Sequence, residues 1–109
     1  MINTLAIAAA WSAASAAYAR LQALRNDAQA AYDRQTLAQN VADEWGDWRR
    51  SASSPGFEVE FRSACVVLEA AEDEFCDASD RADAGWREWG AARALLRGLL
   101  LAKYGIQDD

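Results

Sequence analysis

The residues of this chain that could do chemistry are carboxylates spaced four residues apart. Glu69, Asp73 and Asp77 follow one another at this spacing, and on a helix such side chains project from the same face. Paired carboxylates of this kind can hold a divalent cation, or can act together as acid and base. Di-metal sites in helical bundles also need histidine, which the sequence lacks altogether. We therefore expect neither a metal site nor a catalytic site here.

The remaining catalytic inventory is poor as well. Without histidine, the Ser–His–Asp and Cys–His arrangements are excluded. Cys65 and Cys76 are eleven residues apart, which is about 16 Å along one helix and too far for a disulfide. Two free cysteines are typical of a reducing compartment. We expect a non-enzymatic protein with no cofactor and no small-molecule substrate.

Acidic residues in the second half of the chain collect on one side of a predicted helix. At 3.6 residues per turn, Phe61, Leu68 and Phe75 lie on the opposite, apolar side. The segment from Val66 to Asp83 holds seven acidic residues and one arginine, and so accounts for the net charge of −6. We name six of these acids the acidic stripe and predict that they form a partner-binding face: Glu69, Glu72, Asp73, Asp77, Asp80 and Asp83.

The acidic stripe has two interpretations. It is either a solvated face, partly neutralised by Arg25 and Arg34 if the chain folds back at Pro55, or a binding surface, which fits a basic protein groove or mimics a phosphate backbone. Direct contact with nucleic acid or with an anionic membrane is disfavoured, because both need clustered lysine and arginine. We therefore expect a protein partner or a second copy of the chain.

Helix boundaries follow from punctuating residues and from phase. Pro55 lies in the predicted main turn, 51–56, and Gly105 predicts the end of the last helix. A new start near Gly85, with Asp83 as its cap, divides the second half. The sequence thus predicts a single domain, 1–109, with helices at about 4–34, 36–50, 57–84 and 86–104.

The division of the first half rests on the large apolar residues. Ile7, Trp11, Tyr18 and Leu21 share one helical face, whereas a second set shares a face rotated by about half a turn: Leu37, Val41, Trp45 and Trp48. A capping box, Thr36 with Gln39, lies between the two sets. We expect a break near residues 33–36; the alternative is one long helix that contacts different neighbours on its two sides.

Aromatic and leucine-rich segments provide a second candidate surface. Four tryptophans form two pairs at three-residue spacing, and such residues pack in cores or act as interface hot spots. Five leucines within Leu95–Leu101 lie on several helical faces, which one neighbour cannot bury. The candidate residues for self-association or partner binding are Trp45, Trp48, Trp86, Trp89, Leu95 and Leu99.

These features predict an all-α fold: a compact three- or four-helix bundle, or a helical hairpin, with long amphipathic helices. Alanine accounts for 26 of 109 residues, so we expect a thin core that relies on a partner or on self-association. The function we expect is that of an assembly subunit, such as a structural component of a virion or a connector. The alternative is a small acidic inhibitor of the anti-defence type, which blocks a basic nucleic-acid-binding groove of another protein.

The N-terminal segment, 1–19, is apolar and rich in small residues. It has no positively charged residue before Arg20, whereas a secretory signal begins with a positive region. We expect a protein that is not secreted through a cleaved signal. The expected location is the cytoplasm or a particle assembled inside the cell.

Overall fold

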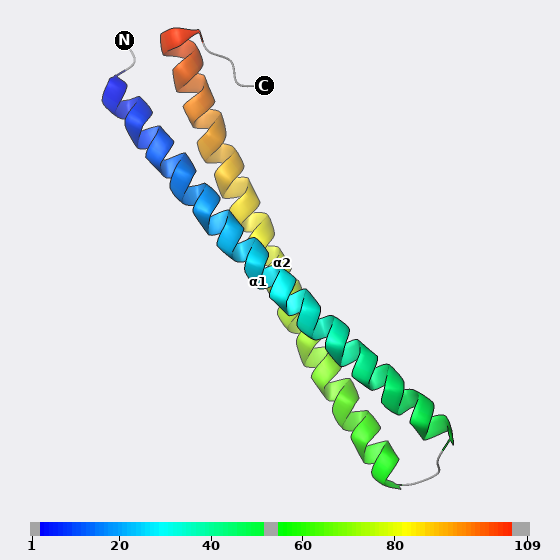
Figure 1. The fold of residues 1–109 in the computed structure, drawn as a ribbon. Helices are drawn as coiled ribbons and strands as arrows, with labels where there is room; N and C mark the ends of the chain where they lie inside the picture. Colours follow the sequence, from blue (N-terminus) through cyan, green and yellow to red (C-terminus); the bar gives the residue numbers. More distant parts are fainter. Residues whose placement is uncertain (1–2, 52–54, 106–109) are drawn as a thin grey trace. The chain divides into compact units, whose positions relative to one another are not determined.

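A computed structural model describes residues 3–51 and 55–105, which form two long α-helices. The first, α1, runs from Thr4 to Ser51, and the second, α2, from Pro55 to Tyr104 (Figure 1). The described residues contain no strand. The prediction of an all-α fold is therefore confirmed.

The helix ends carry the residues that their backbone groups require. The Asn3 side chain accepts a hydrogen bond from the backbone N–H of Leu5 at 2.8 Å, and so caps α1. Pro55 begins α2, where its missing N–H costs nothing. Gly105 ends α2 with a φ of 68°, and its N–H bonds to the carbonyl of Leu101 at 2.9 Å. The predicted stop at Gly105 is confirmed.

Both predicted breaks inside the helices are wrong. Residues 4–34 and 36–50 belong to the single helix α1, and residues 57–84 and 86–104 belong to α2. Thr36 and Asp83, expected as caps, are exposed residues within helices. The described residues therefore do not form the expected compact bundle of three or four helices. Residues 52–54 of the predicted main turn lie outside the described residues.

The continuity of the helices follows from a heptad pattern that the large residues hide. All buried and most half-buried positions in α1 alternate steps of three and four: 7, 10, 14, 17, 21, 24, 28, 31, 35, 38, 42 and 45. The same alternation runs through α2: 57, 61, 64, 68, 71, 75, 78, 82, 85, 89, 92, 96, 99 and 103. An unbroken repeat of this kind keeps one face of each helix against its neighbour, as in coiled coils.

The buried face consists largely of alanine. Of the buried apolar residues described, all but Leu21 are alanines. The second set of residues, which suggested a change of phase, contains side chains that face solvent: Leu37 is 65% exposed and Trp48 is 53% exposed. The phase of the buried face continues instead through Ala31, Ala38 and Ala42, so the break was predicted from residues outside the core.

The chain divides into two compact units, each made from a segment of both helices. In unit 1, residues up to Arg25 pack with residues from Asp80 onward; in unit 2, Asn26–Ser79, the rest of α1 packs with the first part of α2. The two segments run antiparallel within each unit (Figure 1). The prediction of a single domain is not tested by this division.

One ion pair joins the two helices within each unit, and a glycine allows their close approach in unit 1. An ion pair joins Arg20 to Glu88 in unit 1, and another joins Arg34 to Glu74 in unit 2. Gly85 is buried in unit 1, where an added Cβ would lie 2.7 Å from Cδ1 of Leu24. The absence of a side chain at Gly85 is therefore what lets α2 approach α1 so closely at this level.

Candidate docking surfaces

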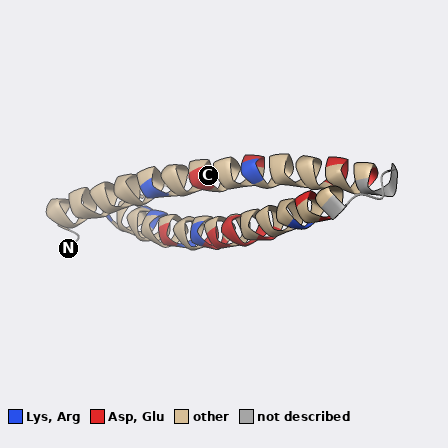
Figure 2. Ribbon diagram, turned by 90° about the horizontal axis from the view of Figure 1, so that it is seen from below, with Lys and Arg blue, Asp and Glu red and all other residues tan. Residues whose placement is uncertain are grey.

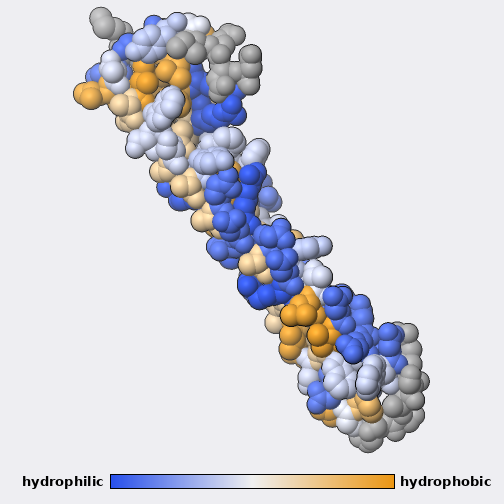
Figure 3. Space-filling view, in the orientation of Figure 1, coloured by the Kyte–Doolittle hydropathy of each residue, from blue (hydrophilic) through white to orange (hydrophobic). Residues whose placement is uncertain are grey.

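Large apolar side chains lie on the outside of both units. Trp11, Leu37 and Val67 are each more than half exposed, although alanine fills the interior. In Figure 3 apolar residues gather in separate patches on the visible face rather than being scattered. Two of the surface grooves lined by these residues are large and lie one in each unit.

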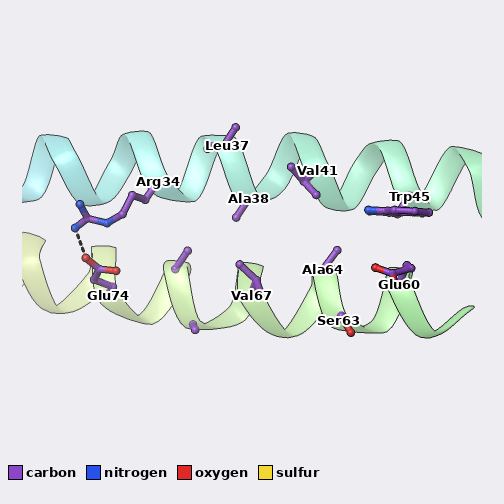
Figure 4. A pocket seen from close by; sticks show the side chains of 12 residues that line it. Arg34, Leu37, Ala38, Val41, Trp45, Glu60, Ser63, Ala64, Val67 and Glu74 are labelled. Carbon is purple, nitrogen blue, oxygen red and sulfur yellow. Dashed lines mark hydrogen bonds and ion pairs between the residues drawn. The ribbon is translucent and has the colours of Figure 1, made fainter. Parts of the chain in front are cut away.

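The first groove lies in unit 2, and we name it the Leu37 groove. It has a volume of about 620 Å³, and its apolar lining includes Leu37, Val41 and Trp45 from α1 and Val67 from α2. Figure 4 shows Ala38 of α1 and Ala64 of α2 each pointing toward the opposite helix, with the ion pair of Arg34 and Glu74 at one end. Glu60 lies at the other end, beside Trp45 (Figure 4).

The second groove lies in unit 1, and we name it the Trp11 groove. Its volume is about 610 Å³, nearly that of the Leu37 groove. Trp11 and Tyr18 line it from α1, and Trp89 and Leu96 from α2. Two arginines also contribute to the lining: Arg93 and Arg97. The guanidinium of Arg93 lies 5.3 Å from the centre of the Trp89 ring, a distance typical of a cation–π contact.

The tryptophan pairs predicted from the sequence are both present as contacting rings. The centres of Trp45 and Trp48 are 6.3 Å apart, and both rings contact Phe57 in unit 2. Trp86 and Trp89 are 5.3 Å apart in unit 1. One member of each pair is half-buried, Trp45 and Trp89, and the other is exposed. In each pair, therefore, one ring is partly covered by its unit and the other lies on the surface.

The tryptophan pair of unit 1 carries stacked arginines. Arg25 lies over Trp86 at 5.0 Å from the ring centre, and Arg93 lies over Trp89. The side chains of Arg49 and Arg50, which follow Trp48 in the sequence, lie outside the described part of the chain. Unit 1 thus carries an aromatic surface with cations stacked on it.

The leucine segment is distributed as its sequence implies. Leu95 is 60% exposed and Leu101 is 46% exposed, whereas Leu99 is half-buried on the heptad face. Leu96 and Leu100 line the Trp11 groove. One neighbouring helix therefore leaves part of this segment open to solvent.

All six residues of the acidic stripe are exposed. Four of them, from Glu69 to Asp77, belong to unit 2, and Asp80 and Asp83 belong to unit 1. In Figure 2 the acidic residues of α2 concentrate in its middle part. Of the two bases expected to neutralise this region, Arg34 pairs with Glu74, outside the stripe, and Arg25 stacks on Trp86.

The two units differ strongly in charge. Residues 26–79, which form unit 2, include twelve acidic and four basic residues, a formal charge of −8. The residues of unit 1 include five acidic and seven basic residues, a formal charge of +2. The Leu37 groove therefore lies in an acidic environment, and the Trp11 groove in a mildly basic one.

Residues 3–51 and 55–105 hold neither a cluster of metal-binding side chains nor a helix that could span a membrane. No three histidine, cysteine, aspartate or glutamate side chains there are grouped so that they could hold a metal ion. Neither helix has an apolar stretch long enough to cross a bilayer. Cys65 and Cys76 are both free thiols.

A comparison with family models, with curated proteins and with solved structures finds no match.

Sequence reasoning missed most of the groove residues. The sequence places Trp11, Tyr18, Leu37 and Val41 on shared apolar faces rather than among the candidate site residues, because large apolar side chains usually mark the core. The signal that would have found them is the alternation of alanines at steps of three and four, because it leaves these four residues outside the heptad face.

Proposed function

We propose that this protein is a non-enzymatic assembly subunit that associates with other copies of itself through its exposed aromatic and aliphatic side chains. The observation that carries this proposal is the inversion of side-chain size: alanines fill the interior, and large apolar residues line the two surface grooves. A structural component of a larger particle, such as a virion or a connector, is the kind of assembly implied.

Large apolar side chains remain at the surface of the folded chain, where a partner can bury them. A buried leucine or phenylalanine contributes about 1.5–3 kcal/mol, whereas an alanine methyl group contributes much less. Leu21 is the only large side chain that is fully buried among the described residues. Covering Trp11 or Leu37 with a partner surface would therefore add burial of a kind that the folded chain largely lacks.

The test is the mass of the full chain in solution, measured by light scattering over a range of protein concentrations at low and at high NaCl. We expect oligomers that persist at high salt, because apolar contacts are not screened by ions. A monomer at every concentration and in both salt conditions would overturn the proposal.

One observation favours a second candidate function, the small acidic inhibitor of a basic groove. The acidic stripe is exposed along its length, and no ion pair is found for its six residues within the described ranges. An inhibitor of this kind would be a monomer, and neutralising Glu72, Asp73 and Asp77 together would abolish its partner binding. An assembly subunit would keep its oligomeric state after the same substitutions.

A further inference from the structure

We propose that copies of this chain associate head to tail, with the Trp11 groove of one copy packed against the Leu37 groove of the next. This inference rests on the proposed self-association and specifies which surfaces meet. Its two supports are the apolar character of both grooves and their opposite electrostatic environments.

Both grooves are apolar. Each presents aromatic and aliphatic side chains, with contributions from both helices of its unit. Interfaces between subunits have an apolar and aromatic centre with a polar rim. Trp11 and Leu37, exposed by 59% and 65%, are the side chains with most to gain from burial at such a centre.

The charges around the two grooves favour contact between unlike grooves. Arg93 and Arg97 lie in the Trp11 groove, whereas the Leu37 groove holds Glu60 and the ion pair of Glu74 with Arg34, within a unit of formal charge −8. A pairing of two Leu37 grooves would bring two strongly acidic units together, and like charges across an interface are costly. A pairing of unlike grooves places the arginines of one copy against the acidic unit of the other.

The symmetry of such a contact sets the products. Contact between unlike surfaces is heterologous, so a copy bound through one groove keeps its other groove available. Two copies that use both grooves on each other form a closed dimer; otherwise the contact repeats into larger species. In either case one kind of contact holds the assembly together, and disabling either groove disrupts it.

The first experiment compares groove variants with matched controls in the full chain. Trp11→Ser and Leu37→Ser each remove one groove centre, and Leu5→Ser and Val66→Ser remove apolar side chains of similar exposure that lie outside both grooves. Sedimentation velocity should show that both groove variants dissociate at concentrations where the controls remain assembled. Circular dichroism checks that all four variants keep their helix content.

The second experiment reverses the charge on each side and then mixes the products. Arg93→Glu together with Arg97→Glu makes the lining of the Trp11 groove acidic, and Glu60→Arg makes the lining of the Leu37 groove basic, because Arg34 also lines it. Each variant alone should associate about tenfold more weakly, because its two grooves then carry charges of the same sign. An equimolar mixture should regain wild-type assembly, since every unlike-groove contact between the two variants again joins opposite charges.

The outcomes separate the inference from the proposed function. Assembly of the wild type with no rescue in the mixture, or with no loss in Trp11→Ser, would overturn head-to-tail pairing while leaving self-association intact. Rescue in the mixture, together with assembly of both controls, supports the pairing. A wild-type chain that is monomeric throughout would overturn the proposed function, and the inference with it.

Discussion

Leu21 differs in kind from the other residues of the interior. It is 1% exposed, and it packs against Gly85 of α2, where an added Cβ would lie 3.7 Å from Cδ1 of Leu21. The alanines around it bury a single methyl group each. The stability of unit 1 therefore depends on this one side chain more than on any other residue of its buried face.

We expect Leu21→Ala to lower the free energy of unfolding by about 2–5 kcal/mol, because it removes buried methyl groups and leaves a cavity. Leu5→Ala is the matched control, since Leu5 is 75% exposed and alanine is the better helix former. Urea denaturation followed by circular dichroism measures both. A loss for Leu21→Ala no greater than that for Leu5→Ala would contradict the role given to Leu21.

At the scale of the elements, sequence patterns predicted that the chain is helical and where its outer ends lie. Asn, Pro and Gly act locally at helix ends, so Gly105 could be assigned from sequence. The continuity of α1 could not be predicted in this way, because Leu37 and Val41 imitate a buried face while Ala38 and Ala42 form it. Size is a poor guide to burial when two helices pack through methyl groups.

The candidate site could likewise be predicted only in part from the sequence. The tryptophan pairs were found because their three-residue spacing survives in any helix, and the structure brings their rings into contact. The grooves depend on which face meets the neighbouring helix, so an incorrect phase hid Trp11 and Leu37. The exposure of the acidic stripe followed directly from its composition.

Gly85 provides a test of how closely α1 and α2 approach. In an exposed helix interior, Gly→Ala raises the free energy of unfolding by about 1 kcal/mol, and we expect this for Gly90→Ala, whose added Cβ meets no atom within 4 Å. At Gly85 the added Cβ displaces Leu24, so we expect Gly85→Ala to gain nothing or to destabilise the protein.

Thermal unfolding of both glycine variants beside the wild type makes the comparison. The transition temperature of Gly90→Ala should lie above that of the wild type, and that of Gly85→Ala at or below it. Equal increases in the two variants would show that α1 and α2 are not closely apposed at Gly85.

Across the whole molecule, the acidic residues favour solubility, but their spacing also opposes folding. The acidic stripe places Glu69, Asp73 and Asp77 four residues apart in turn, and like charges at this spacing destabilise a helix by about 0.2–0.5 kcal/mol per pair. The exposed ion pairs of Arg20 and Arg34 contribute about 0–1 kcal/mol each. These local effects are similar in size, and the formal charge of −8 on unit 2 adds repulsion between acidic groups farther apart, so repulsion is the larger electrostatic effect there.

We expect NaCl to raise the transition temperature of unfolding, because salt screens this repulsion more than it weakens the few attractive pairs. The measurement is a thermal melt by circular dichroism, at protein concentrations where light scattering shows a monomer. Asp73→Asn, which removes the shared member of two repulsive pairs, should melt at a higher temperature and respond less to salt. A transition temperature that falls with salt would mean that the attractive pairs dominate.

The alanine interior also has a consequence for how the protein responds to temperature. The heat capacity of unfolding grows with the apolar surface newly exposed, and ordinary domains show about 12–15 cal/mol/K per residue. A chain whose interior is mostly methyl groups, with its large side chains already in water, exposes less new apolar surface when it unfolds. Calorimetry of the monomer should therefore give a smaller heat capacity increment and a flatter stability curve, so that cooling and warming change its modest stability by similarly small amounts.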